Sequence, residues 1–188
     1  IYYRLGKERV WMNNFENEGS TLWNFNSQNE GKQDSVFRRG ALAAQHKRYA
    51  DSPGNIVTNL EEKIPINKKL GHTLHGYIKT INAKDVTLEL RSSINRTGDN
   101  LETISIKDSI NGNSPWRKYW GNISVPENSE FFDIRLNSSA PDTGVSFSWF
   151  DDVGLIEWDS LIFFSSLPIE FIHPNNYDYI QIYTNQPI

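Results

Sequence analysis

The chain of 188 residues contains no cysteine, and no apolar run approaches the roughly 20 residues that a transmembrane helix needs. Without cysteine, neither a disulfide framework nor a thiolate metal site can form. Helical periodicity is also scarce, because no stretch of about 11 residues keeps apolar side chains at the i, i+3, i+4 and i+7 positions. These absences argue against disulfide-stapled folds, thiolate metal centres and direct membrane insertion, and they leave β-structure as the expected architecture.

Basic side chains are neither abundant nor clustered. The chain has 19 Lys and Arg against 23 Asp and Glu, which gives a net charge of −4 and a pI near 5.6. A mildly acidic chain is poorly suited to the phosphate backbone of a nucleic acid or to an anionic membrane surface. We therefore expect neither of these as the main partner.

Short alternating apolar and polar runs lie between turn sequences such as 51–54, 111–115 and 141–144. This spacing is typical of all-β sandwiches and barrels, and the length suits one domain with a substantial core. The chain begins at Ile1 with no signal peptide, so we expect a domain cut from a longer protein. Strands are predicted at residues 2–12, 35–46, 56–64, 72–80, 86–92, 102–106, 117–125, 131–137, 145–155 and 177–183.

Three of these strands, 72–80, 86–92 and 131–137, alternate with a period of two, so each has an apolar face and a polar face. The polar faces have two interpretations. They form an ordinary solvated surface, or they form a ligand groove in which tyrosine stacks and charged groups bind hydroxyls. The side chains concerned are His75, Tyr77, Lys79, Thr87, Glu89, Arg91, Asp133, Arg135 and Asn137.

Paired carboxylates occur near both ends of the chain. Glu16 and Glu18 lie near its start, and Asp151 and Asp152 lie in an aromatic segment about 135 residues later. Neighbouring carboxylates repel each other and resist burial, so they need compensation. A cation bound near Glu16 and Glu18 would supply it and would join the first strand to the last; solvent exposure or a basic partner such as Arg38 are the alternatives.

Five segments in order resemble the carbohydrate-binding modules of the galactose-binding-like jelly-roll class, particularly those of bacterial glycanases. They are Asn14-Phe15-Glu16 with Trp23, Arg39–Ala43, Gly76–Thr80, Trp116–Tyr119 with Val125-Pro126, and Phe150–Leu155. The resemblance implies an all-β sandwich of jelly-roll topology over residues 11–158. We expect 1–10 and 159–188 to be flanking strands that pack on this domain or on a missing partner domain.

The resemblance also implies two sites. In the family, the acidic residue just before the valine of the closing motif faces a structural Ca²⁺, which assigns Asp152 to the metal beside Glu16 and Glu18. By analogy the sugar groove is the concave face, with a tryptophan at its rim. The expected ligand-binding residues are His75, Tyr77, Glu89, Arg91, Arg135 and Trp120.

Catalytic motifs are missing from the sequence: it has no nucleophile elbow, Walker loop or His-Glu helix motif. Glu89 and Asp133 could form a glycosidase acid pair on paper, but we expect no enzymatic activity. The predicted function is non-catalytic binding of a polysaccharide or glycan by an accessory domain of a larger secreted or cell-surface bacterial protein. The alternative is a structural domain without a ligand, which packs on a catalytic or membrane-anchored partner through residues 1–10 and 159–188.

Overall fold

The computed structural model describes residues 2–10, 15–16, 23–25, 28–52, 54–98, 100–106, 108–160, 163–164 and 178–183. These residues form 13 strands and no helix, which confirms the all-β prediction. The strands are β1 (Tyr2–Glu8), β2 (Trp23–Asn24), β3 (Glu30–Gln33), β4 (Ala43–Tyr49), β5 (Asn55–Leu60), β6 (Ile64–Pro65), β7 (Gly71–Ser93), β8 (Asn100–Ser105), β9 (Ile110–Ile123), β10 (Phe131–Ser139), β11 (Val145–Trp158), β12 (Phe163–Phe164) and β13 (Tyr179–Tyr183).

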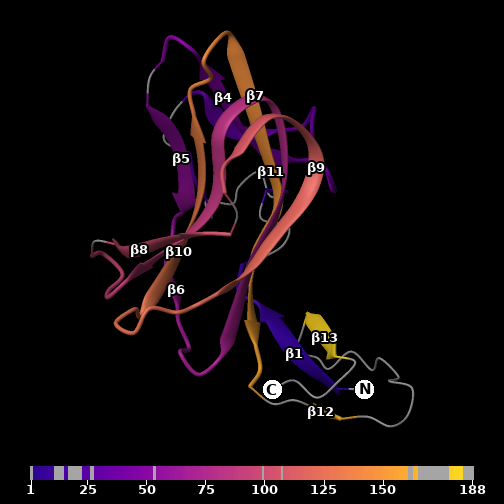
Figure 1. The fold of residues 1–188 in the computed structure, drawn as a ribbon, viewed down its shortest axis with the longest axis vertical. Coiled ribbons are helices and arrows are strands. Elements are labelled where there is room, and N and C mark those ends of the chain that lie inside the picture. The colour runs from indigo at the N-terminus through magenta and orange to yellow at the C-terminus, as the bar shows by residue number, and fades with distance from the viewer. Residues whose placement is uncertain are drawn as a thin grey trace.

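The strands form two antiparallel sheets that are continuous through β7, as Figure 1 shows. Sheet A has the order β3-β4-β11-β7-β9, and β1 pairs with the far end of β11. Sheet B has the order β2-β5-β10-β7-β8. The first half of β7, residues 71–81, pairs with β11, and the second half, residues 84–93, pairs with β10.

The continuity of β7 corrects the prediction of two separate strands at 72–80 and 86–92. The chain does bend between them, because Asn82 and Asp85 take left-handed backbone conformations with φ of 49° and 48°. Asn and Asp tolerate this region better than other non-glycine residues. Hydrogen bonds from their backbone N–H groups to Asn113 Oδ1 (2.7 Å) and Asn111 Oδ1 (2.9 Å) on β9 hold the bend.

The core lies between the two sheets and consists of the inward positions that alternation predicts. Each fully buried aliphatic or aromatic side chain contributes about 1.5–3 kcal/mol relative to an exposed one. At Gly76 an added Cβ would lie 2.9 Å from Leu88 and 3.1 Å from Val153, so the two halves of β7 approach closely there. The main members of the core are Leu74, Ile78, Val86, Leu88, Leu90, Phe132, Ile134, Leu136, Phe150, Val153 and Leu155.

The two ends of the described chain lie together beside sheet A (Figure 1). Strand β1 pairs with β11 over Gly6–Glu8, and β13 pairs with β1 over five residues. Both terminal strands therefore join sheet A, and the division into an 11–158 domain with flanking strands at 1–10 and 159–188 stays a prediction. No helix among the described residues is long and apolar enough to span a membrane.

Candidate functional site

Polar side chains form two adjacent rows on the outward face of sheet B. Strand register places Asn24, Asn59, Arg135 and Glu89 side by side across β2, β5, β10 and β7. The next row pairs Asp133 on β10 with Arg91 on β7. Cross-strand neighbours on one face lie about 4.5–5.5 Å apart at Cβ, so the rows form one continuous polar surface.

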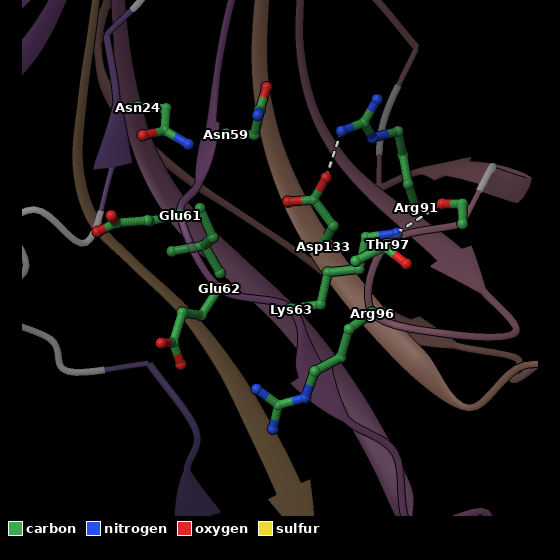
Figure 2. Close-up of a pocket in the computed structure, with 11 residues that line it drawn as sticks. Asn24, Asn59, Glu61, Glu62, Lys63, Arg91, Arg96, Thr97 and Asp133 are labelled. Carbon is green, nitrogen blue, oxygen red and sulfur yellow. Dashed lines mark hydrogen bonds and ion pairs between the residues drawn. The ribbon is translucent and has the colours of Figure 1, made fainter.

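A groove of about 400 Å³ lies on this surface. None of its described lining residues is aromatic, so recognition here depends on hydrogen bonds from planar amide, carboxylate and guanidinium groups rather than on ring stacking. The lining residues, most of which Figure 2 labels, are Asn24, Asn59, Leu60, Glu61, Glu62, Lys63, Arg91, Arg96, Thr97, Gly98 and Asp133.

The Arg91–Asp133 ion pair forms the floor of the groove, and Figure 2 shows the two groups pointing toward each other from neighbouring strands. Asp133 is only 3% exposed. Burial raises the pKa of the Asp133 carboxyl, and the ion pair with Arg91 opposes this shift. Asp133 Oδ1 and Arg91 Nε are buried without a hydrogen-bond partner among the described residues, which leaves an acceptor and a donor unused beneath the groove.

One wall of the groove is the 94–98 loop that follows β7. Lys63 Nζ donates to the Gly98 carbonyl oxygen (2.9 Å) and to Ser93 Oγ (3.0 Å), and so ties the loop to β7. The Arg96 guanidinium lies 5.7 Å from the centre of the Phe131 ring. These contacts orient the wall before any ligand binds, which reduces the entropic cost of binding.

The six expected ligand-binding residues do not share one surface, which corrects the expectation of a single groove. Glu89, Arg91 and Arg135 come together on sheet B, with Arg135 Nε 3.8 Å from Glu89 Oε2. His75, Tyr77 and Trp120 lie on the outward face of sheet A, because β7 passes from one sheet to the other. Alternation identifies the outward side of a strand but not the sheet to which it belongs.

On sheet A, each of the other three expected residues has a different environment. His75 is 4% exposed beneath the terminal strands, with its Nε2 3.0 Å from Glu8 Oε2 and its ring against Tyr179. Tyr77 lies beneath the Arg38 guanidinium, 3.4 Å from its ring centre. Trp120 is 61% exposed. A role in binding stays a prediction for all three, but none lines the groove that contains Arg91.

Sequence reasoning missed several lining residues of the groove. The alternation of β5 does contain a signal, because Ile56, Thr58 and Leu60 point inward and Asn59 therefore points outward. Strand β2 has only two residues, too few for a periodic pattern, so Asn24 could not be recognised. Residues 61–63 and 96–98 belong to loops that only the folded chain brings to the groove.

The acidic segments of the two chain ends meet at residues 38–42. Glu16 accepts hydrogen bonds from the backbone N–H groups of Ala41 (2.7 Å) and Leu42 (3.1 Å). Asp151 Oδ2 accepts those of residues 38 (2.8 Å) and 39 (3.1 Å). Burial raises the pKa of Asp151, and these backbone N–H groups oppose the shift. Two carboxylates thus bracket one five-residue segment.

The calcium prediction involves Glu16, Glu18 and Asp152. Asp152 forms an ion pair with Arg38, the basic partner considered as an alternative to a metal. The part of the chain that the structure describes contains no group of three or more Asp, Glu or His side chains that could hold a metal ion. Glu18 lies outside that part. The described oxygens therefore fit compensation by N–H groups and a guanidinium better than six to eight metal bonds, and calcium stays a prediction.

No protein-family model matches the chain, and no curated protein matches it. Solved structures do match. The family 30 carbohydrate-binding module gives a TM-score of 0.55 at 12% identity over 88% of this chain and 93% of that one. A family 61 carbohydrate-binding module in complex with β-1,4-galactotriose gives 0.52 at 12% identity over 79% and 97%. The enzymatically active domain of bacteriophage CBA120 tailspike protein 4 gives 0.56 at 14% identity over 79% of this chain.

The chain has the fold of a carbohydrate-binding module. This confirms the predicted jelly-roll sandwich and the resemblance on which it was based, at the level of fold. The chain spans 21% of the matched tailspike chain, so it corresponds to one part of that longer protein. At such identities the likeness concerns the fold alone, and function has to be argued from the site.

Proposed function

We propose that this chain is a non-catalytic carbohydrate-binding domain and that it binds a polysaccharide in the groove on sheet B. The observation that carries the proposal is a polar row across four strands beside a second row, the Arg91–Asp133 pair, which forms the floor of a groove of about 400 Å³. The fold supports it, because modules with this fold include one solved with β-1,4-galactotriose. A groove along a sheet suits an extended polymer.

Hydrogen bonding from planar groups is the proposed mode of recognition. Asn24 and Asn59 each offer an amide donor and acceptor, and Arg91 offers a fork of N–H donors to vicinal hydroxyls. Asp133 holds Arg91 in place, and its Oδ1 has no partner among the residues that the structure describes. Such solvent-exposed sites bind weakly, and we expect a Kd on the order of micromolar to millimolar, about 4–8 kcal/mol.

The environments of the two candidate catalytic acids support a non-catalytic role. A glycosidase needs two carboxyl groups that reach the scissile bond from either side. Here Asp133 is 3% exposed and forms an ion pair with Arg91, and Glu89 is 9% exposed and accepts a 2.5 Å hydrogen bond from Thr87 Oγ1. Both carboxyl groups are committed to neighbours within sheet B.

The setting that we propose is an accessory domain of a larger secreted or cell-surface protein, in which the groove holds the parent protein near its polysaccharide. A structural Ca²⁺ at Glu16, Glu18 and Asp152 stays part of this proposal. It would compete with Arg38 for the Asp152 carboxylate, since the two already form an ion pair. Its role would be to stabilise the fold.

The test is affinity gel electrophoresis on a panel of neutral polysaccharides that begins with β-1,4-galactan. We expect the wild type to be retarded by at least one polymer. The double variant N24A/N59A loses two amide hydrogen-bonding groups and should bind about tenfold more weakly. N128A is the matched control, because Asn128 is exposed between β9 and β10 and is not part of the groove lining.

Two results would contradict the proposal. Equal retardation of the wild type and N24A/N59A, with N128A unchanged, would remove the groove as the binding site. No retardation by any neutral polymer would favour the alternative of a packing domain without a ligand. Melting temperatures of all three proteins show whether a loss of binding reflects a loss of folding.

A further inference from the structure

A second distinctive surface lies on the outward face of sheet A, on the far side of the core from the groove. Four aromatic rings follow one another there across β4, β11 and β7, and each has a cationic group above it. We call this surface the cation–aromatic face; it consists of Tyr49, Tyr77, Phe147 and Trp149 with Arg38, Lys47 and Lys79.

Strand register explains how these side chains meet. Phe147 on β11 lies opposite Lys47 on β4, and Trp149 lies opposite Lys79 on β7. Successive outward positions bring the rings of Phe147 and Trp149 into a stack, with centroids 5.5 Å apart and an interplanar angle of 10°. Lys47 Nζ is 5.0 Å from the centre of the Tyr49 ring. All these residues occupy outward positions of antiparallel strands.

The rings position the ammonium groups rather than offer bare stacking surfaces. Lys47 Nζ also lies 5.9 Å from the centre of the Phe147 ring, and Lys79 Nζ lies 5.6 Å from the centre of the Trp149 ring. Trp149 is itself only 4% exposed, and its indole N–H has no hydrogen-bond partner in the part of the chain that the structure describes. A cation over a ring is held by about 0.5–1 kcal/mol at exposed sites, so each lysine has a preferred place.

The charge on this face is opposite in sign to that of the chain. The net charge of the chain is −4, yet the outward positions 45–49, 77–81 and 145–151 contain two lysines and one acid, Asp151. The carboxylate of Asp151 is occupied by backbone N–H groups. Within the part of the chain that the structure describes, neither Lys47 nor Lys79 has a carboxylate at ion-pair distance. Arg38 is paired with Asp152, so the positive charge that this face presents to a partner comes from Lys47 and Lys79.

We propose that the cation–aromatic face binds an anionic polysaccharide, such as a polymer of uronic acids, independently of the groove on sheet B. Carboxylates of the polymer would pair with Lys47 and Lys79, whose ammonium groups the rings beneath them hold in place. The choice of a polysaccharide among anions rests on the proposed function, whereas the choice of an anion rests on charge complementarity.

Single-stranded nucleic acid is the main competing anion, and the face fits it less well. Nucleic-acid-binding domains are usually strongly basic, with a pI above about 9, whereas this chain has a pI near 5.6. Base stacking would also need accessible ring faces. Here Lys79 and its neighbours cover Trp149, and Arg38 covers Tyr77.

The experiment compares the full chain with K47Q/K79Q in gels that contain polygalacturonate. The matched control is K68Q/K84Q, which removes the same charge from two lysines elsewhere that are paired with Glu130 and Asp142. We expect retardation of the wild type, a loss of about tenfold or more in affinity for K47Q/K79Q, and a change of less than about twofold for the control. Retardation should weaken as salt is added.

Three outcomes would overturn the proposal: no retardation of the wild type by polygalacturonate, equal losses in the two double variants, or tighter lysine-dependent binding of an oligo-dT probe. The groove variant N24A/N59A makes the two proposals separable. N24A/N59A should keep its affinity for polygalacturonate while its affinity for neutral polysaccharides falls. The polygalacturonate test can therefore be interpreted even if the groove proposal fails. Melting temperatures of all variants serve as the folding control.

Discussion

The outward faces of sheets A and B use the same strand, β7, to build surfaces of different chemistry. On sheet B the charged groups of opposite sign lie in register, so the partly buried Arg91 meets the buried Asp133. On sheet A the cations lie in register with aromatic rings, so Lys79 meets Trp149, and no carboxylate within the described ranges lies at ion-pair distance from it. Cross-strand register, rather than composition, decides whether a cation is neutralised or presented to a partner.

Sheet A is itself divided into a covered half and an open half. In one half, β1 pairs with the end of β11 and β13 pairs with β1. Glu8 on β1 receives hydrogen bonds there from the backbone N–H of Leu155 (2.7 Å) and from the Tyr179 hydroxyl (3.1 Å). In the other half lies the cation–aromatic face. Side chains of the terminal strands therefore cover His75, whereas Lys47 and Lys79 stay partly exposed.

The contrast between buried and exposed ion pairs predicts the largest loss of stability. Asp133→Ala should cost about 3–5 kcal/mol in the free energy of unfolding, because it leaves the partly buried Arg91 guanidinium without its carboxylate partner. Arg38→Ala breaks the more exposed pair with Asp152 and should cost about 1 kcal/mol or less. Urea denaturation measures both. The double variant R91M/D133L should recover most of the loss, and equal costs for the two single variants would contradict the contrast.

The two sheets are joined across the core by His46, which predicts a loss of stability in acid. Its ring nitrogens lie 2.9 Å from Ser138 Oγ and 2.9 Å from Thr58 Oγ1 on sheet B. Burial, and secondarily Arg48, lowers the pKa of His46 to about 3. Between the unfolded pKa near 6.5 and this value, the unfolded state binds the proton first. The free energy of unfolding should therefore decrease as the pH is lowered through this window, by up to about 1.4 kcal/mol per pH unit.

Urea denaturation from pH 7 to about pH 4 checks this prediction. His46→Gln is the control and should show a flatter dependence. Asp133 and Asp151 contribute with the opposite sign, because their raised pKa values favour protonation of the folded state. A wild-type curve that keeps or gains stability relative to His46→Gln as the pH falls would contradict the assignment.

We expect a smaller loss of stability from a substitution at Gly154, which lies where the terminal strands contact sheet A. An added Cβ would lie 2.6 Å from both Glu8 Oε2 and His75 Nε2, so Gly154→Ala should displace the terminal strands at a cost of about 1–3 kcal/mol. Gly31→Ala is the control, since its Cβ would meet nothing within 4 Å. Thermal unfolding and amide exchange of β13 measure the effect. Identical behaviour of the two variants would show that the terminal strands do not depend on this contact.

The smallest expected change is the shift of the melting temperature when calcium is removed by a chelator. If Glu16, Glu18 and Asp152 bind Ca²⁺, EDTA should lower the melting temperature by a few degrees, about 2–4 °C per kcal/mol of binding free energy lost. Arg38→Ala removes the competing guanidinium and should enlarge the response to added Ca²⁺. An unchanged melting temperature in both proteins, with and without EDTA, would discard the metal.

Much of the fold was predictable from alternation and from five short segments. The inward side chains of residues 86–90 and 132–136 form the core as expected. Alternation along a strand does not depend on which strand pairs with it. The order of the motifs from Asn14-Phe15-Glu16 to Phe150–Leu155 indicated the carbohydrate-binding-module fold. Half of the candidate ligand residues, Glu89, Arg91 and Arg135, also lie together on one face.

The site as a whole was less predictable, because it depends on contacts between distant residues. No local pattern shows that β7 passes from sheet A to sheet B at the bend near Asn82. The sequence therefore predicted one groove for His75, Tyr77 and Arg91, which lie on different sheets. The covering of His75 by β13 joins residues 104 positions apart. The groove lining from β2 and from the 96–98 loop likewise depends on chain folding.

Sequence determined which side chains of each strand face inward, that the chain is all-β, and that its acids need partners, since these follow from local periodicity and from the cost of burying charge. Register and sheet membership were decided only in the folded chain. They set Arg91 against Asp133 and Lys79 against Trp149. Pairing between strands depends on the packing of the whole core, and no single segment encodes that packing.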